Sequence, residues 1–126
     1  CRMKGPKPLL AVLVAIALIA CAVPASAGAV AYKHYVACGT TENAKPAHVC
    51  PKKGKKGAFF KSLRADVTYS ICVRFPTGKS ICAKAQQAKA HVPYVNKITS
   101  NIPGKHRVTW FVGGKRIGSF VFRITA

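Results

Sequence analysis

The chain has 126 residues, of which 21 are Lys or Arg and only two are Asp or Glu, so its formal net charge is +19. A glycosidase needs two carboxylates beside the scissile bond, and a Ser-His-Asp hydrolase needs an acid that orients its histidine. Because Glu42 and Asp66 are the only carboxylates and no Gly-x-Ser-x-Gly elbow is present, the sequence argues against a hydrolase. The charge favours attraction to polyanions instead.

The first 27 residues have the layout of a secretory signal peptide. Basic residues precede an apolar run of 15 residues from Leu9 to Val23, and Ala25-Ser26-Ala27 offers a cleavage site. The run is shorter than the roughly 20 residues of a membrane span. We predict a secreted protein in which residues 1–27 are removed and residues 28–126 form one domain without a transmembrane span. The alternative is a lipoprotein anchored through Cys21, because the residues before it resemble a lipobox.

Short strands separated by turns are predicted in the first half of this domain. Residues 31–38 form a first strand, and residues 39–57 read as a loop because they are rich in Gly, Pro and Lys. A second apolar strand begins at Ala58. Residues 66–75 alternate apolar and polar side chains with period two, which predicts a strand with one buried face. After a Pro-Thr-Gly turn, residues 79–83 run back along it.

The second half ends in another hairpin. Residues 83–91 are helix-prone by composition but short, so their structure stays undecided, and residues 92–98 contain a strand. From Val108 to Ile124 the apolar pattern predicts two strands joined by a two-residue turn at Gly113-Gly114. The apolar phase shifts at Gly118, which predicts a β-bulge there.

Four cysteines follow the signal segment, and in an oxidising compartment they indicate two disulfides. Three pairings are possible among Cys38, Cys50, Cys72 and Cys82. Pairing the strands around Thr77 places Cys72 directly opposite Cys82, and cross-strand partners have Cβ atoms about 4.5–5.5 Å apart. We therefore predict Cys38–Cys50 and Cys72–Cys82, with the second bond on the outer side of its hairpin.

Six or seven short strands in a domain of this size predict an all-β fold, a small disulfide-stapled β-sandwich. From residue 58 onward, the strand order, the late Trp110 and the closing Gly-Gly hairpin resemble immunoglobulin-like modules of secreted bacterial proteins. The sequence departs from antibody domains because it lacks their inter-sheet Cys…Trp…Cys arrangement. The resemblance implies an immunoglobulin-like sandwich, it carries over no site residue, and such a fold implies no particular activity.

The large aromatic residues of the strands are predicted to form the core. They fall on the apolar phase of the strands: Tyr69, Phe75, Trp110, Phe120 and Phe122. Buried rings cannot serve as stacking platforms for bases, so we expect no specific nucleic-acid recognition.

A metal site is the sharpest alternative to the disulfide prediction. Four residues could be written as a zinc ligand set: His34, Cys38, His48 and Cys50. The spacing lacks the Cys-x-x-Cys knuckle of structural zinc sites, and an oxidising compartment favours a disulfide with two solvated histidines. We therefore predict neither a metal nor a cofactor. The two remaining histidines, His91 and His106, are predicted on the surface.

The densest positive charge lies in the loop at 52–56, and it predicts an anion-binding tip. A charge run of this kind is often only a solvated loop. Here 18 cations face two carboxylates after residue 27, a net charge near +16, and they cannot be neutralised internally. The candidate anion-binding residues are Lys52, Lys53, Lys55 and Lys56, with Lys115 and Arg116 as further contributors.

These observations favour a non-enzymatic secreted module that associates with anionic envelope or extracellular polymers. One alternative is a cationic membrane-active effector, which would need an exposed apolar patch or an amphipathic helix, and residues 83–91 are the candidate helix. A metal-binding or hydrolytic secreted protein is a further alternative, and the shortage of carboxylates argues against the hydrolytic form.

Overall fold

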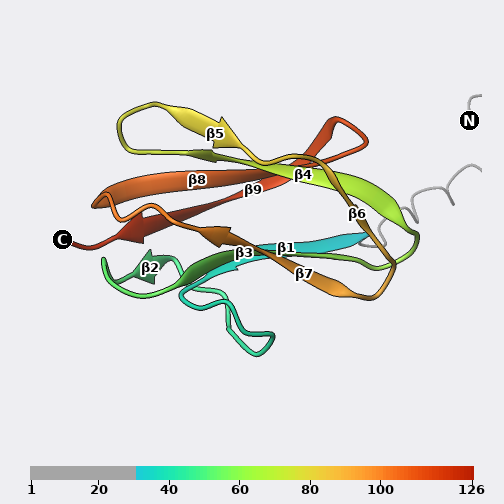
Figure 1. The fold of residues 1–126 in the computed structure, drawn as a ribbon, viewed down its shortest axis with the longest axis horizontal. Coiled ribbons are helices and arrows are strands. Elements are labelled where there is room, and N and C mark those ends of the chain that lie inside the picture. Colours follow the sequence, from blue (N-terminus) through green and yellow to red (C-terminus); the bar gives the residue numbers. More distant parts are fainter. Residues whose placement is uncertain (1–30) are drawn as a thin grey trace, which may run out of the picture. The chain divides into compact units, whose positions relative to one another are not determined.

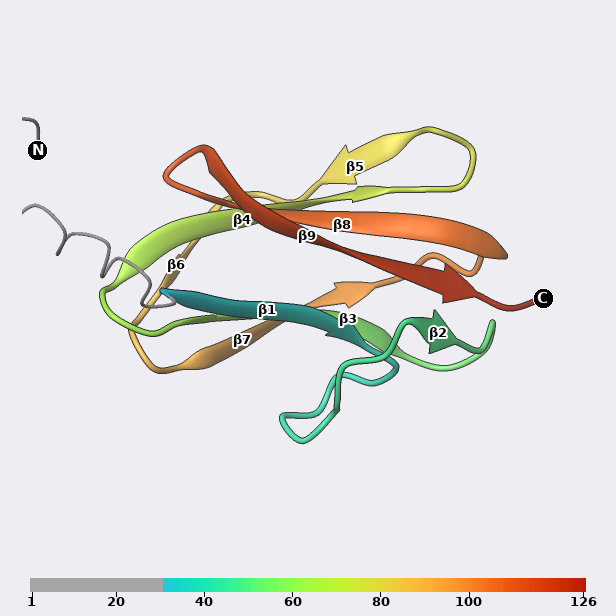
Figure 2. The ribbon, with the colours of Figure 1, turned by 180° about the vertical axis from the view of Figure 1, so that it is seen from behind.

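In the computed structural model, two β-sheets pack face to face (Figures 1 and 2). The structure describes residues 31–126, so the predicted signal segment 1–27 and both alternative first residues, Gly28 and Cys21, lie outside the described residues. Within 31–126, no helix is long and apolar enough to cross a bilayer. The described residues confirm the predicted all-β fold.

The strands are, in chain order, β1 (Tyr32–Ala37), β2 (Val49–Cys50), β3 (Lys56–Ser62), β4 (Val67–Arg74), β5 (Ser80–Cys82), β6 (Gln86–Ala88), β7 (Pro93–Ile98), β8 (Gly104–Val112) and β9 (Lys115–Ile124). The smaller sheet has the order β1-β3-β7. The larger sheet has the order β2-β9-β8-β4-β5, and β6 also pairs with β4. Strand β2 runs parallel to β9, and the other named pairings are antiparallel.

The core forms where the apolar phases of the two sheets meet. Tyr69, Trp110 and Phe122 are buried, whereas Phe75 and Phe120 are half-buried against them. Full burial of one large apolar side chain stabilises a fold by about 1.5–3 kcal/mol. Each strand with a period-two pattern therefore turns its apolar face towards the core. The aromatic residues of the strands therefore belong to the core, as predicted.

Two segments differ from the sequence prediction because of non-local pairing. The predicted loop 39–57 contains β2, which pairs with the end of β9, and it overlaps the first two residues of β3, which starts at Lys56. The undecided segment 83–91 contains β6, whose Ala88 pairs with Val67 of β4. Strand β5 covers only one end of β4, so the free backbone groups at its other end accept β6.

Both predicted disulfides are present. Cys72 and Cys82 are direct register partners in β4 and β5, and their bond lies on the outer side of the larger sheet. The Cys38–Cys50 bond ties the end of β1 to β2, so it links the smaller sheet to the larger one. The hairpin pairing could be predicted because strand register is fixed locally by a short turn.

The irregularity predicted at Gly118 has a packing reason. The β8–β9 register shifts between Trp110 and Phe111, which leaves Ile117 as the extra residue beside Gly118. A Cβ atom on Gly118 would lie 2.7 Å from the His34 ring. Glycine is therefore required where β1 crosses closely over β9.

Candidate anion-binding site

The exposed outer face of the larger sheet brings together like charges from distant parts of the chain. Arg74 of β4 and Arg107 of β8 are direct cross-strand partners, and both are exposed. Their neighbours Val73 and Val108 face the core, so strand alternation holds both arginines on the outer face. Like charges directly opposite each other destabilise a sheet, and a bound anion would relieve that repulsion.

Further cations surround this pair. Lys105 of β8 lies directly opposite Arg123 of β9, which makes a second like-charge pair on the same face. The Arg107 Nη1 and the Arg116 Nη2 both donate to the Ser119 Oγ, at 3.3 and 3.4 Å. Two guanidinium groups therefore converge on one neutral acceptor, where a charged oxygen would be a stronger partner.

Two adjoining clefts lie over these arginines. The first, of about 380 Å³, is lined by Cys72, Arg74, Ser80, Arg107, Thr109, Phe111 and Arg116. The second, of about 470 Å³, is lined by Arg74, Phe75, Pro76, Gly78, Lys105, His106 and Arg107. Because both include Arg74 and Arg107, the two clefts adjoin at this pair, and together we call them the arginine groove. None of its lining residues is a carboxylate.

The arginine groove suits an extended anion. From Lys105 to Phe111 it follows seven residues of β8, and the six steps between them span roughly 20 Å at about 3.3 Å each. Four of the five arginines in residues 31–126 lie on the outer face of this sheet, and Arg64 is the exception. The guanidinium fork pairs with the two oxygens of a carboxylate, sulfate or phosphate, which lysine does not match.

Sequence reasoning found only part of this groove. Arg116 lines it, and Lys115 is exposed beside Arg116 as the first residue of β9, directly after the Gly113-Gly114 turn. Arg74, Lys105 and Arg107 were not among the candidates, although each falls on the polar phase of its strand. Their polar positions in the strands could have indicated that these side chains are exposed. That they lie together could not be predicted, because the pairing of β4 with β8 is non-local.

The predicted lysine tip is a separate feature, and one member differs from the others. Lys52, Lys53 and Lys55 are exposed in the turn between β2 and β3. The placement of Lys56 in an exposed tip is wrong, because its side chain is 1% exposed.

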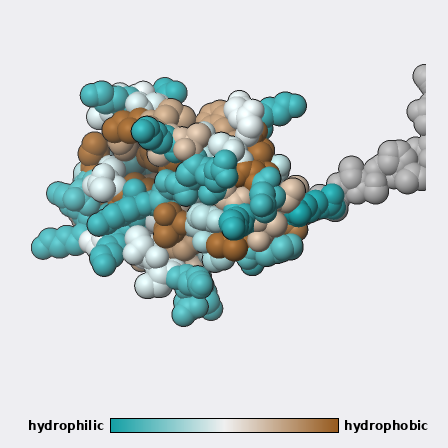
Figure 3. Space-filling model, turned by 45° about the vertical axis from the view of Figure 1, so that its right-hand side comes forward, coloured by the Kyte–Doolittle hydropathy of each residue, from teal (hydrophilic) through white to brown (hydrophobic). Residues whose placement is uncertain are grey.

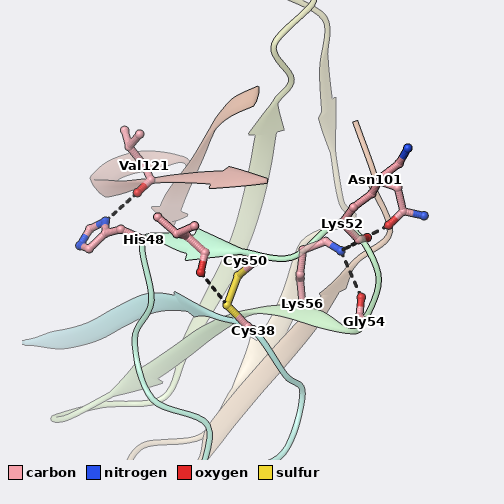
Figure 4. The surroundings of a disulfide bond; sticks show 9 residues. Cys38, His48, Cys50, Lys52, Gly54, Lys56, Asn101 and Val121 are labelled. Atoms are coloured by element: carbon pink, nitrogen blue, oxygen red, sulfur yellow. Dashed lines mark hydrogen bonds between the residues drawn. A yellow bond between two sulfur atoms is a disulfide. The ribbon is translucent and has the colours of Figure 1, made fainter. Parts of the chain in front are cut away.

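The Lys56 ammonium holds the turn together from inside. Its Nζ donates to the carbonyl oxygens of Gly54 and Lys52 at 3.1 and 3.4 Å (Figure 4). Burial lowers the pKa of Lys56. Carbonyl groups that face inward in a tight turn need donors, and the chain supplies one from the first residue of β3. Lys56 is therefore part of the fold rather than a ligand-binding residue.

The residues of the hypothetical zinc set are used in other ways. Cys38 and Cys50 are bonded to each other. The His34 ring stacks on Trp110 at 4.7 Å, and the His48 ring stacks on Phe120 at 4.3 Å. No group of metal-binding side chains converges within residues 31–126. The disulfide interpretation of the two cysteines is confirmed.

His106 is buried, so its prediction as a surface residue is wrong. Its ring stacks on Phe122, its Nδ1 lies 3.1 Å from the Gly104 carbonyl, and its Nε2 lies 2.8 Å from the Ser100 Oγ. Because a carbonyl only accepts, Nδ1 carries the proton and Nε2 accepts from the Ser100 hydroxyl. Burial lowers the pKa of His106, and the charge of Lys56 lowers it further.

Comparison with known proteins bears on the fold. No family model matches the chain, and no curated protein sequence is significantly similar to it. An immunoglobulin-like protein from Pseudomonas aeruginosa has a similar structure, with a TM-score of 0.51 and 13% identity over 73% of this chain and 96% of that protein.

A second solved structure aligns less well. It is a DNA-bound alkylpurine DNA glycosylase from Pseudomonas fluorescens, with a TM-score of 0.42 and 20% identity. The alignment covers 75% of this chain and 30% of the glycosylase, and it carries no functional argument. The sheet order, the buried Trp110 and the likeness to the first structure together identify residues 31–126 as an immunoglobulin-like β-sandwich.

Proposed function

We propose that this domain is a non-enzymatic, extracytoplasmic binding module that holds an anionic polymer in the arginine groove. The observation that carries the proposal is the cross-strand pair Arg74 and Arg107, which is shared by two adjoining clefts without a carboxylate in their lining. Two like-charge pairs on one exposed sheet face cost stability, and an anionic ligand would offset that cost. Two disulfides support an oxidising location, either secreted or anchored through a lipidated Cys21.

The size of the groove supports a polymer over a single small ion. The cations of the groove are not gathered around one point. They follow the direction of β8, from Arg116 through the central arginine pair to Lys105. The exposed lysines of the 51–55 turn follow β2, whose Cys50 pairs with Ile124 at the end of β9 (Figure 1). These lysines lie at the Lys105 end of the sheet, so a long chain that leaves the groove there would meet more positive charge.

An enzymatic function has less support. The Asp66 Oδ1 accepts a hydrogen bond from the Ala90 amide at 2.9 Å, which agrees with a structural role at the entry to β4. Glu42 lies on a different loop, between β1 and β2. A glycosidase would require two carboxylates that flank one bond.

The membrane-active alternative has less support, because its candidate helix, residues 83–91, instead contains strand β6. The large exposed apolar residues are distributed over separate segments: Val49, Ile81, Val92, Val95 and Ile102. The face drawn in Figure 3 is mostly hydrophilic, and its apolar areas are small and separate. A membrane-inserting surface would instead need a contiguous apolar patch.

The test compares two variants that lose the same charge. Arg74→Gln/Arg107→Gln removes the centre of the groove, and Lys84→Gln/Lys89→Gln removes two exposed lysines outside it. Retention on heparin and on a polyphosphate resin is measured between about 50 and 200 mM salt, where binding by several cations weakens by orders of magnitude. We expect the groove variant to elute much earlier, with a shallower salt dependence, and the control to elute close to wild type. Equal elution of the two variants would mean that only net charge matters and would overturn the proposal.

A further inference from the structure

The outer face of the smaller sheet carries a cleft of its own, of about 350 Å³. It is lined by Lys33, Tyr35, Glu42, Phe59, Phe60, Lys61 and Pro93. These residues come from β1, from β3, from the first residue of β7 and from the loop between β1 and β2. None of them belongs to the arginine groove or to the lysine tip, so this cleft has no part in the function proposed above.

The cations of this cleft are paired across neighbouring strands, as those of the arginine groove are, but a carboxylate lines this cleft as well. Lys33 and Lys61 are direct cross-strand partners in β1 and β3. Cross-strand partners have their side chains on the same side of a sheet, and both residues line the cleft, Lys33 exposed and Lys61 half-buried. Like charges in this position are unfavourable in an empty sheet, and a ligand anion between them would remove the penalty.

The wall of the cleft is apolar and fixed in place. The Phe59 side chain is 5% exposed and stacks on the Tyr35 ring with 5.0 Å between centroids. The Tyr35 hydroxyl donates to the Ala44 carbonyl at 3.2 Å, which holds the loop beside the sheet. A Cβ on Gly57 would lie 2.9 Å from the Gly39 carbonyl, so glycine is needed for that close approach. The wall therefore does not depend on a ligand for its shape.

The third element of the cleft is a carboxylate at its edge. Glu42 is exposed on the loop, and it lines both this cleft and a smaller one of about 100 Å³ over Phe59 and Pro93. A carboxylate accepts hydrogen bonds from hydroxyl groups but repels phosphate. Ammonium groups, an apolar wall and a hydrogen-bond acceptor together match the anionic groups, the C–H faces and the hydroxyls of an acidic polysaccharide. A polyphosphate offers only the first of these.

We propose that this cleft is a second binding site, specific for acidic polysaccharide, and that it makes one molecule bivalent. The two sheets form opposite layers of the sandwich, so their outer faces point away from each other (Figures 1 and 2). One polymer chain cannot easily lie on both faces of a domain this small, so two chains are joined. The bridging part of this inference rests on the function proposed for the arginine groove, and the second site itself does not.

The experiment follows contact between two polymer populations. Polygalacturonate labelled with a donor fluorophore is mixed with polygalacturonate labelled with an acceptor, and energy transfer is measured as protein is added. A bivalent protein gives a maximum at an intermediate ratio and a decline in excess, because each chain is then saturated separately. We expect that maximum for wild type and for Lys84→Gln/Lys89→Gln, and at least a fivefold loss for Lys33→Gln/Lys61→Gln. Equal bridging by the two variants would overturn the second site.

Two controls separate the possible causes of a lost signal. The Lys33→Gln/Lys61→Gln variant should melt at or above the wild-type temperature, because a like-charge pair is removed, and it should keep its retention on a polyphosphate resin, which the arginine groove provides. Light scattering without polymer should give a monomer. If Lys33→Gln/Lys61→Gln is a dimer and bridges as wild type does, bridging results from self-association, and the inference is contradicted.

Glu42 supplies the test of ligand class. Glu42→Gln should weaken binding of polygalacturonate to Arg74→Gln/Arg107→Gln, the variant in which the second site is the main one, and should leave or increase its binding of polyphosphate. A parallel rise for both polymers would mean that Glu42 acts only by repulsion and would remove the preference for polysaccharide. If wild type binds neither polymer, the proposed function fails. If wild type binds polygalacturonate but never joins donor to acceptor, the second site alone fails.

Discussion

Arg74 and Arg107 lie directly opposite each other on β4 and β8, and each is held on the outer face by a buried valine next to it in its strand. The two residues are far apart in the sequence, and they meet because the central strands of the larger sheet pair across the whole domain. The chain thus places two positive charges where a neutral pair would stabilise the sheet better. This cost is understandable if the position serves a ligand.

The first prediction concerns stability without a ligand. Arg74→Gln should raise the free energy of unfolding by about 0.2–1 kcal/mol, because it relieves repulsion by Arg107. Added salt should stabilise wild type more than the variant, since salt screens exposed charges. Denaturant titration at low and high salt measures both effects. A variant less stable than wild type at low salt would show that Arg74 contributes more by packing over the sheet than it costs by repulsion.

The second prediction concerns the buried lysine. Lys56→Met should lower the free energy of unfolding by about 1–3 kcal/mol, because the Gly54 and Lys52 carbonyls lose a buried donor. Lys53→Met, in the exposed part of the same turn, is the matched control and should change stability little. Thermal melts of the two variants make the comparison. A Lys56 variant as stable as the Lys53 variant would mean that water satisfies these carbonyls equally well.

The lysine tip is tested without Lys56. We expect the variant Lys52→Ser/Lys53→Ser/Lys55→Ser to fold as wild type does, because these side chains are exposed. It should weaken heparin retention less than Arg74→Gln/Arg107→Gln does, although it loses one more charge. The reason is that a turn of solvated lysines lacks the fixed forks of the groove. Chromatography over the same salt range decides the order. The reverse order would make the turn the principal site.

Another prediction concerns the close contact between His34 and Gly118. Gly118→Ala should cost about 1–3 kcal/mol, because the new methyl group would lie 2.7 Å from the His34 ring. Combining it with His34→Ala should recover part of that loss, since the ring that clashes is gone. A double-mutant cycle measured by denaturant unfolding gives the coupling between the two positions. Additive effects would show that the His34 ring is not what excludes a side chain at position 118.

The last prediction concerns acid. Burial lowers the pKa values of His34 and His106, and the unfolded chain retains the ordinary value of about 6.5. The folded state therefore binds fewer protons, so stability is complete above about pH 6.5 and declines as pH falls below it towards the folded pKa values.

The measurement is the free energy of unfolding between pH 7.5 and 5. His106→Phe should flatten the decline while keeping the ring contact with Phe122, and His91→Gln, which removes an exposed histidine, is the control. A decline unchanged in His106→Phe would place the acid sensitivity elsewhere, with His34 as the next position to test.

Features that depend only on local chain geometry could be predicted from the order of the residues. The alternation from Val67 to Arg74 predicted β4, because one face of a strand must be buried. The short turn at Thr77 then fixed the register that joins Cys72 to Cys82, and the Gly-Gly turn closed the last hairpin. These predictions need only residues that are close in the sequence, so they could be made without knowledge of the fold.

Which charged residues are buried, and which of them lie side by side, depends on how the two sheets pack. Lys56 and Lys53 are indistinguishable in a run of lysines, and only the path of the turn into β3 buries one and exposes the other. His106 is buried because β8 places its ring against Phe122 and within hydrogen-bond distance of the Ser100 hydroxyl. The pairing of Arg74 with Arg107 depends on which strands become neighbours, and that is settled by burial of the apolar faces of two whole sheets, a non-local free energy that no short stretch of sequence records.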